Sequence, residues 1–387
     1  MISNNEAEII IIGAGLAGST AATVLGAKGL RVILLDSRDP YPVCFKAEKI
    51  EEDQAQLFRK FGLLDALAPA TGRIRTVLNA QRGKVLYAQP IEQYGIRYHD
   101  MVNLIRRRLP KSVDFRLGQV KNIVTGPQLQ RVAINGGVEL TSRLVVVASG
   151  TSAQLCARLG IRRTMIRPRH SFAFGFDIER LDGERFHFDS VTYYPFRTSE
   201  RIAYLTLFLI GRTMRANLFT FRTSDEEWVR QFLSEPAEQL ESALPGLDKI
   251  IGPFRVVGRV ECATINLYTT EDLRHPGIVL IGDAFQSVCP TTGTGLSRVL
   301  TDVDVLSECI PAWLDTPRMG ANKISQFYNH PRKIAADVSS LKQTEYVRKV
   351  STARARQWIV YQARFRANAL LKRAAMFLIQ LGLFEIY

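Results

Sequence analysis

The chain reads, from Ile9 to Asp36, IIIIGAGLAGSTAATVLGAKGLRVILLD. The isoleucine run ends at a glycine and does not alternate with polar residues, which is typical of a strand buried on both faces of a parallel sheet. The motif G-x-G-x-x-G follows, then a helical pattern over 16–28 and a second apolar strand over 31–35. This order predicts a Rossmann-like α/β domain that binds a dinucleotide cofactor.

The glycines of this loop have separate expected roles. Gly13 permits the tight turn, Gly15 lets the backbone approach a pyrophosphate, and Gly18 lets the helix pack closely on the strand. The positive end of the helix attracts the phosphates, and Asp36 is spaced to hold the adenosine ribose. The loop alone does not separate FAD from NAD. The predicted cofactor-binding residues here are Gly13, Ala14, Gly15, Leu16, Ala17, Gly18, Asp36 and Ser37.

A second glycine-rich stretch lies at residues 278–302 and reads IVLIGDAFQSVCPTTGTGLSRVLTD. A short apolar strand precedes Gly282 and Asp283, and two glycines after Pro290 open a helix. Backbone N–H groups at a helix start suit a flavin ring, which gains negative charge when it is reduced. The alternative is an ordinary strand-to-helix turn. Together with the first loop, this stretch predicts FAD.

These two stretches resemble those of the FAD-dependent aromatic hydroxylase family, the group A flavoprotein monooxygenases. The resemblance implies a glutathione-reductase-like FAD-binding fold of the hydroxylase subclass, with Asp283 at the ribityl chain. It implies further cofactor contacts from Val120, Pro290, Gly293, Thr294, Gly295 and Leu296.

The resemblance also implies an activity. Members reduce FAD with NADPH or NADH, form a flavin hydroperoxide with O2, and transfer one oxygen atom to an aromatic or lipid-like biosynthetic intermediate. The chain departs from the family pattern at Ser149, where the family has the aspartate of A-D-G, and this departure bears on the use of NADPH. It departs again at Phe285 and Gln286, where G-D-A-A-H is usual.

Strand patterns without intervening helices occupy 172–178, 190–196, 202–210 and 213–220. They predict an antiparallel substrate-binding sheet inserted into the cofactor domain, with helices over 54–67, 99–109 and 225–243. The predicted division assigns 1–75, 99–168 and 273–335 to FAD binding, 76–98 and 169–272 to the substrate sheet, and 336–387 to a basic amphipathic helical C-terminus.

Candidate catalytic residues come from the inserted sheet and from the segment after the second strand. Lys46 lies where members of the resembled family often carry a basic residue over the flavin, and the alternative is a solvated lysine. Tyr193, Tyr194 and His170 are polar aromatic residues of the expected sheet, and each also suits an ordinary half-buried strand.

The charge is concentrated in one place. The formal net charge is +14, and from Lys342 to Tyr387 nine Lys or Arg face two Glu. No nucleic-acid module accompanies this charge, so we expect no nucleic-acid partner. A basic amphipathic helix can lie on anionic lipid or pack its apolar face on the protein body. Both alternatives stay open here.

Cysteine spacing and hydropathy set further limits. The five cysteines form no C-x-x-C pair, so we expect neither a metal site nor a disulfide framework. The N-terminal residues lack a signal-peptide pattern, and no apolar stretch reaches the ~18 residues of a membrane span. These features predict a cytoplasmic protein, with membrane association left open.

Two other classes of function compete with the monooxygenase. One is a different FAD enzyme on the same scaffold, such as a prenyl-lipid reductase, a dehydrogenase or a halogenase. The chain lacks the W-x-W-x-I-P stretch of halogenases. The other is a flavin-binding or lipid-binding protein without turnover.

Overall fold

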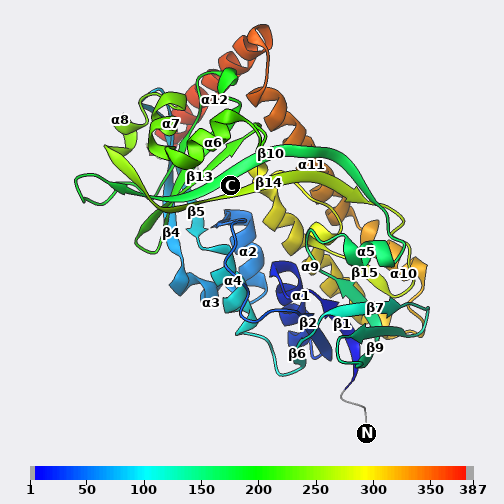
Figure 1. The fold of residues 1–387 in the computed structure, drawn as a ribbon. Coiled ribbons are helices and arrows are strands. Elements are labelled where there is room, and N and C mark those ends of the chain that lie inside the picture. Colours follow the sequence, from blue (N-terminus) through cyan, green and yellow to red (C-terminus); the bar gives the residue numbers. More distant parts are fainter. Residues whose placement is uncertain (1–4, 381–387) are drawn as a thin grey trace.

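The structure is a computed structural model that describes residues 5–380. In this range the chain forms two sheets, which are separated in space and linked by helices and long strands (Figure 1). The first sheet lies near the N-terminus, and the second lies beside the helices of the C-terminal part of the chain.

The first sheet has a mainly parallel centre with the strand order β6-β2-β1-β9-β8-β7, and β15 also pairs with β9. Residues 9–12 pair in parallel with 32–35 on one side and with 144–147 on the other. The Rossmann-like arrangement predicted from the sequence is therefore confirmed. Its strands are β1 (Glu6–Ile12), β2 (Val32–Asp36), β6 (Val113–Leu117), β7 (Val120–Val124), β8 (Gln130–Ile134), β9 (Glu139–Val147) and β15 (Ile278–Leu280).

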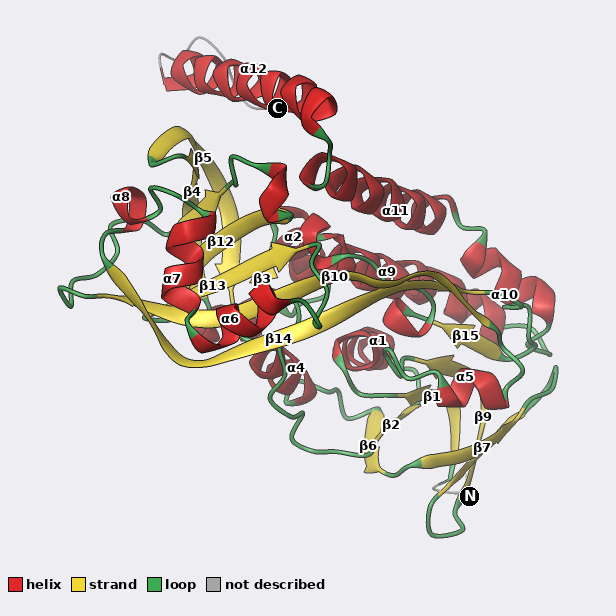
Figure 2. Cartoon of the chain, turned by 45° about the horizontal axis from the view of Figure 1, so that its top comes forward, coloured by secondary structure: helices red, strands yellow, loops and turns green. Residues whose placement is uncertain are grey.

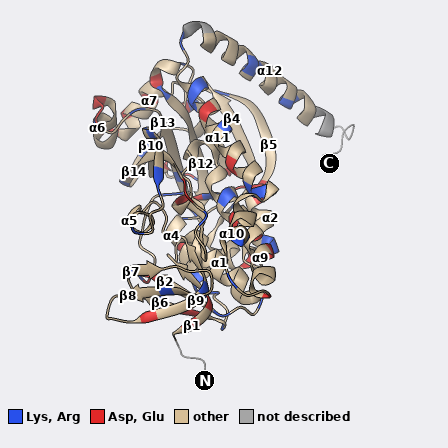
Figure 3. Cartoon of the chain, turned by 90° about the vertical axis from the view of Figure 1, so that its right-hand side faces the viewer, with Lys and Arg blue, Asp and Glu red and all other residues tan. Residues whose placement is uncertain are grey.

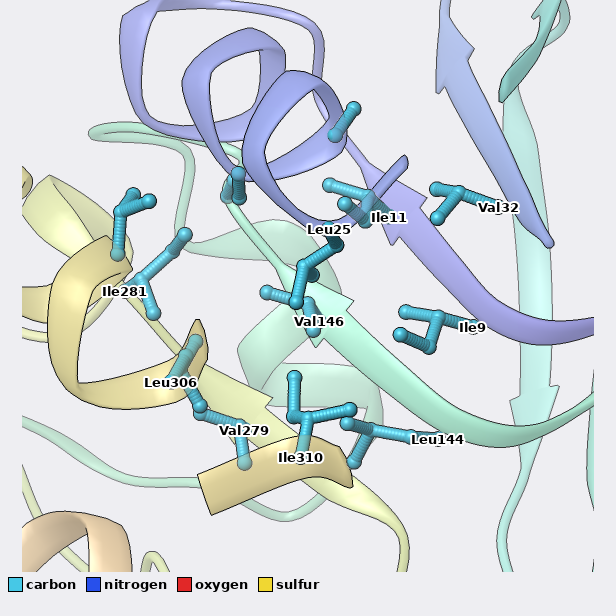
Figure 4. Close-up of a cluster of buried hydrophobic side chains, with 14 of the residues drawn as sticks. Ile9, Ile11, Leu25, Val32, Leu144, Val146, Val279, Ile281, Leu306 and Ile310 are labelled. Carbon is cyan, nitrogen blue, oxygen red and sulfur yellow. The ribbon is translucent and has the colours of Figure 1, made fainter. Parts of the chain in front are cut away.

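Both faces of this sheet are buried, which explains why its strands do not alternate. Ile9, Ile11 and Val146 point to the face covered by helices α1 (Leu16–Ala27) and α9 (Thr294–Leu314) (Figure 4). Ile10, Ile12 and Val145 belong to a separate apolar cluster on the opposite face. The paired cores fix the carboxyl ends of β1, β2 and β9, where the first glycine loop lies.

The second sheet has the order β14-β10-β13-β12-β11-β4-β5-β3. Its neighbours are antiparallel except for β11 and β4, which run parallel, so the predicted antiparallel layer is a mixed sheet at this point. Strands β4 and β5 belong to this sheet although they come from the N-terminal half of the chain. The strands are β3 (Lys49–Ile50), β4 (Gly72–Gln81), β5 (Lys84–Gly95), β10 (Arg163–Arg180), β11 (Ser190–Tyr193), β12 (Ile202–Ile210), β13 (Thr213–Thr220) and β14 (Phe254–Thr270).

The two faces of the second sheet differ in what covers them. Phe174 and Phe176 pack against Phe232 under three short helices, α6 (Glu227–Ser234), α7 (Pro236–Ala243) and α8 (Asp248–Ile251). Ala173 lies on the opposite face, in a cluster with Phe219 and with Cys289 of the second glycine-rich stretch. The sheet therefore turns one apolar face towards the predicted flavin loop.

Three predicted elements are shorter than expected, each for a local reason. The helix over 54–67 divides at Gly62, whose φ is +70°, and that over 225–243 divides before Pro236 because proline cannot continue the preceding helix. The strand over 190–196 ends before Pro195, which lacks the N–H group that a ladder needs. Between α1 and residue 251 the α-helices are α2 (Glu52–Lys60), α3 (Leu64–Leu67), α4 (Tyr98–Arg106), α5 (Gln154–Arg158), α6 (Glu227–Ser234), α7 (Pro236–Ala243) and α8 (Asp248–Ile251).

The C-terminal part is helical, as predicted. Helices α9, α10 (Ala321–Tyr328) and α11 (Pro331–Ser351) lead to α12 (Ala355–Gln380), which lies at the outer edge of the molecule (Figure 2). Residues 381–387 of the predicted amphipathic tail lie outside the described range. None of the described helices combines the length and apolarity required to cross a membrane.

Candidate active site

A cavity of about 500 Å³ opens at the carboxyl ends of β1, β2 and β9. Its size falls within the range of small-molecule sites. Loops that lie far apart in the sequence meet here, including both predicted cofactor motifs. Of the residues predicted to bind cofactor or act in catalysis, the cavity is lined by Gly13, Gly15, Leu16, Ala17, Asp36, Ser37, Lys46, Val120 and Asp283.

The glycine loop has the close contacts that its sequence predicts. A Cβ atom on Gly18 would lie 1.8 Å from the Gly13 carbonyl oxygen, and one on Gly13 would lie 2.5 Å from the Ala148 oxygen. Gly13 also has a φ of +99°, which disfavours a side chain. Gly15 precedes the first turn of α1, and a Cβ atom there would meet only the Tyr41 ring, at 3.7 Å. The start of α1 is therefore open towards the cavity.

Asp36 is held by the loop that it faces. Its Oδ2 accepts hydrogen bonds from the Ala14 N–H at 2.7 Å and from Arg106 Nη2 at 3.1 Å. Its Oδ1 accepts one from the Arg38 N–H at 3.1 Å. Because Asp36 also lines the cavity, this carboxylate joins the glycine loop to the position predicted for the adenosine ribose.

Arg106 is the main residue that the sequence did not indicate. Its side chain is buried, and it also donates to the carbonyl oxygens of Ala14 and Arg38, each at 2.8 Å. The guanidinium thus ties α4 to both ends of the first cofactor motif. A charged group with this many partners fixes the loop even before a ligand binds.

Ser149 provides an independent sign of a ligand. Its Oγ is buried, lacks a hydrogen-bond partner among the described residues, and belongs to the cavity wall. Buried hydroxyls are normally paired. The open start of α1, the ribose-side carboxylate and this hydroxyl fit the pyrophosphate and adenosine of a dinucleotide.

Two tyrosines, Tyr41 and Tyr98, line the cavity together with Lys46 and Asp283. The Lys46 Nζ lies 5.3 Å from the centroid of the Tyr98 ring. Burial, and then the nearby Asp283 carboxylate, raise the pKa of Tyr98, and burial followed by Tyr98 raises the pKa of Tyr41. Both hydroxyls therefore stay protonated near neutral pH. Lys46 shares the lining of the cavity with three other basic residues, Arg38, Lys121 and Arg158.

The segment that carries Lys46 is anchored at its far end. Glu48 is buried and pairs with Arg215 of β13 at 2.7 Å. Arg97, which precedes α4, pairs with Asp177 of β10 at 2.6 Å and lies 3.6 Å from Glu48. This ionic cluster joins the loop after β2 to the second sheet.

The other predicted flavin-loop residues lie beside this cavity rather than in its wall. Pro290, Gly293, Thr294, Gly295 and Leu296 form the turn η4 (Pro290–Thr292) and the start of α9. Gly293 has a φ of +67°, and its carbonyl accepts a hydrogen bond from Gln54 Nε2 at 2.9 Å. Tyr204 of β12 donates to the Thr291 carbonyl oxygen at 3.0 Å, which connects the turn to the second sheet. Ala14 and Gly18 lie behind the wall within the glycine loop.

The aromatic candidates from the second sheet divide between its faces. Tyr193 lies in the cluster under the short helices, donates to the Pro245 oxygen at 2.6 Å, and accepts from the Gly83 N–H at 2.8 Å. These contacts place the Tyr193 side chain on the face of the sheet that the short helices cover, away from the predicted flavin turn. Tyr194 points the other way, towards Tyr204, with ring centroids 6.3 Å apart.

His170 lies away from the cavity. Its ring is buried, contacts Phe221 edge-on at 5.5 Å, and has no hydrogen-bond partner among the described residues at either nitrogen. Burial, and then the Arg348 cation, lower the pKa of His170 to about 4. The ring is therefore neutral near pH 7. The backbone carbonyl of His170 accepts a hydrogen bond from Arg348 Nη1 at 2.7 Å, and this bond joins β10 to α11.

Comparisons with known proteins agree with this geometry. The squalene epoxidase erg1 of Aspergillus fumigatus is 24% identical over 376 residues, covering 89% of this chain and 76% of the epoxidase. The ubiquinone hydroxylase UbiL of Rhodospirillum rubrum is 26% identical over 333 residues, covering 80% of this chain and 73% of the hydroxylase.

Among solved structures, p-nitrophenol 4-monooxygenase PnpA from Pseudomonas putida superposes with a TM-score of 0.76 at 17% identity, covering 98% of each chain. At that identity the likeness shows the fold alone. Residues 6–318 match the family described as FAD binding domain. The chain therefore belongs to this family, and it is an FAD-dependent oxidoreductase.

Proposed function

We propose that the protein is a monooxygenase that uses bound FAD and O2 to hydroxylate an aromatic or lipid-like intermediate. The observation that carries the proposal is the apolar cluster between the second sheet and the predicted flavin turn. Phe219 and Leu267 of the sheet are buried against Cys289, immediately before Pro290. An apolar face beside the turn suits a hydrophobic substrate and would help to keep water from a reactive cofactor.

FAD supplies the oxygen-activating chemistry when it is bound, and the chain binds, orients and shields. The glycine loop and the start of α1 would hold the pyrophosphate of FAD, Asp36 would bind its ribose, and Asp283 would bind its ribityl chain. Lys46 provides positive charge at the cavity wall. Tyr204 holds the turn at Thr291 against the second sheet, so the apolar face and the turn stay together.

The names of the relatives support oxygenation. They are a squalene epoxidase, a ubiquinone hydroxylase and a nitrophenol monooxygenase, which fits an aromatic or lipid-like substrate. We infer that NADPH or NADH is the reductant, with Ser149 in place of the usual aspartate. The division into FAD-binding, substrate and C-terminal segments given above forms part of the same proposal.

We further propose a cytoplasmic location with peripheral membrane contact through residues 336–387. All five cysteines are free, as a reducing compartment predicts. The described part of this segment, including α12, is basic and rich in apolar side chains.

The proposed reaction is tested by anaerobic mixing of the FAD-loaded protein with NADH or NADPH, followed by O2 in the presence of phenolic and polyprenyl candidate substrates. A monooxygenase consumes one O2 per turnover and, with its true substrate, releases little H2O2. Flavin that neither nucleotide reduces, with or without any candidate, contradicts this function and favours a different FAD enzyme.

A further inference from the structure

Helix α12 has one face that packs on the protein body. Its Phe365 ring contacts the Tyr194 ring at a centroid distance of 4.9 Å, and its Trp358 ring contacts Phe196 at 5.5 Å. Ala369 on the same side is buried. These contacts, with others to β5, hold the helix against the edge of the second sheet.

The outward face of α12 is also apolar. Ile359, Val360, Leu370 and Leu371 are 61%, 51%, 66% and 68% exposed. At 3.6 residues per turn, positions eleven apart share one side of a helix, so these four side chains form one strip. Three alanines on the same side of the helix are exposed too: Ala363, Ala367 and Ala374. Single exposed apolar side chains are common on proteins, whereas a contiguous exposed apolar strip marks an interaction site.

Basic residues border this strip. Arg364 lies on one flank, and Arg366 and Arg373 lie on the other, all exposed. The sequence of α12 contains no Asp or Glu, and Figure 3 shows Lys and Arg along the helix. If two copies of the chain met through this face, arginines would oppose arginines without an acidic partner. An anionic surface would instead pair with both flanks.

We propose that the outer face of α12 docks on a bilayer that contains anionic lipids, with the four large apolar side chains among the acyl chains and the arginines at the phosphates. The exposed apolar strip and its cationic flanks supply the apolar and basic groups with which a helix binds an anionic membrane interface, while the aromatic face opposite packs on the protein. This surface deepens the membrane contact proposed above and rests on it. Docking through α12 places the edge of the second sheet at the bilayer and leaves the FAD cavity, at the other end of the molecule, in water (Figures 1 and 2).

The test is flotation of the full 387-residue, FAD-loaded protein with vesicles of phosphatidylcholine alone or with 30% phosphatidylglycerol. We expect binding to the anionic vesicles that falls as salt rises. Leu370→Glu/Leu371→Glu and Arg364→Glu/Arg373→Glu are each expected to weaken this binding by roughly tenfold or more. Arg185→Glu/Arg212→Glu changes the net charge by as much as the second variant, at exposed sites outside α12, and is expected to bind within about twofold of the parent.

Flavin absorbance and circular dichroism establish that each variant is folded. Equal binding to neutral vesicles, or an equal loss in the Arg185/Arg212 control, overturns the proposal. So does a dimer that forms without lipid and is lost in the Leu370/Leu371 variant, because that result assigns the strip to a second copy. Vesicle binding needs no turnover, so a failed oxygenation assay leaves this test unaffected.

Discussion

Replacing Arg106 by methionine removes the group that joins α4 to both ends of the first cofactor motif. Methionine keeps most of the side-chain volume but leaves the Ala14 and Arg38 carbonyls and the Asp36 Oδ2 without this donor. All three hydrogen bonds come from the charged guanidinium, and a hydrogen bond that involves a charged group contributes about 1.5–3 kcal/mol. Because contributions from one network do not add, we expect a loss of about 4 kcal/mol in the free energy of unfolding, within the range of about 3–5 kcal/mol for breaking a buried ion pair.

The consequence for the cofactor follows from the same contacts. Without Arg106, the Asp36 carboxylate keeps only its backbone donors, so the loop and the ribose-binding group are less well ordered before FAD arrives. We expect FAD affinity to fall by roughly 10- to 100-fold, since ordering one loop on binding costs about 1–3 kcal/mol.

The assays are urea unfolding of the apoprotein and fluorescence titration with FAD. Arg107→Met is the matched control, because Arg107 is the next residue and is exposed; its effect on unfolding should stay within about 0.5 kcal/mol. In a double-mutant cycle with Asp36→Asn, we expect a coupling energy of about 1–3 kcal/mol. A loss below about 1 kcal/mol for Arg106→Met with unchanged FAD affinity would refute the assigned role of this arginine.

Three further predictions concern the glycine loop, the cavity wall and the buried histidine. Gly18→Ala places a methyl group against the Gly13 oxygen and should yield protein with little flavin absorbance, whereas Gly320→Ala, which meets nothing within 4 Å, should retain it. Lys46→Met should weaken FAD binding by about tenfold, which is the effect of losing one nearby cation, and should leave the free energy of unfolding unchanged. Lys46→Arg, which keeps the charge, should restore the FAD affinity. Fluorescence titration measures the affinity, and an unaltered value for Lys46→Met would exclude Lys46 from the site. The pKa of His170 is lowered to about 4 in the folded protein, so as pH falls the unfolded chain binds a proton at this histidine before the folded chain does. The free energy of unfolding should therefore fall by up to about 3 kcal/mol between pH 6.5 and pH 4, and His170 should have no effect on it above pH 6.5. Urea unfolding across this range should show a smaller loss in His170→Phe, and identical pH profiles would contradict the shift.

The sequence predicted the centre of the first sheet because its signals are local. The isoleucine run, the glycines and Asp36 lie within 28 consecutive residues, and each has a conformational reason for its position. The long-range partner of Asp36 gave no such signal. Arg106 reaches it across 70 residues of chain, from a helix whose pattern shows only that one face is buried.

The second sheet shows a different limit. Alternation along a strand places Tyr193 and Tyr194 on opposite faces, but it does not say which face meets the flavin turn. That choice depends on the short helices, which cover the side of Tyr193. Likewise, the sequence of α12 indicated basic and apolar residues without separating those that pack on Tyr194 from those that face outwards.

Oxygenation itself is tested most directly by isotope labelling. The FAD-loaded protein is supplied with NADPH or NADH, ¹⁸O2 and the substrate that suppresses H2O2 release, and the product is examined by mass spectrometry. The proposed monooxygenase predicts that one ¹⁸O atom enters each product molecule. A product formed without ¹⁸O, while the flavin still turns over, would contradict the monooxygenase and assign the chain to another kind of FAD-dependent oxidoreductase.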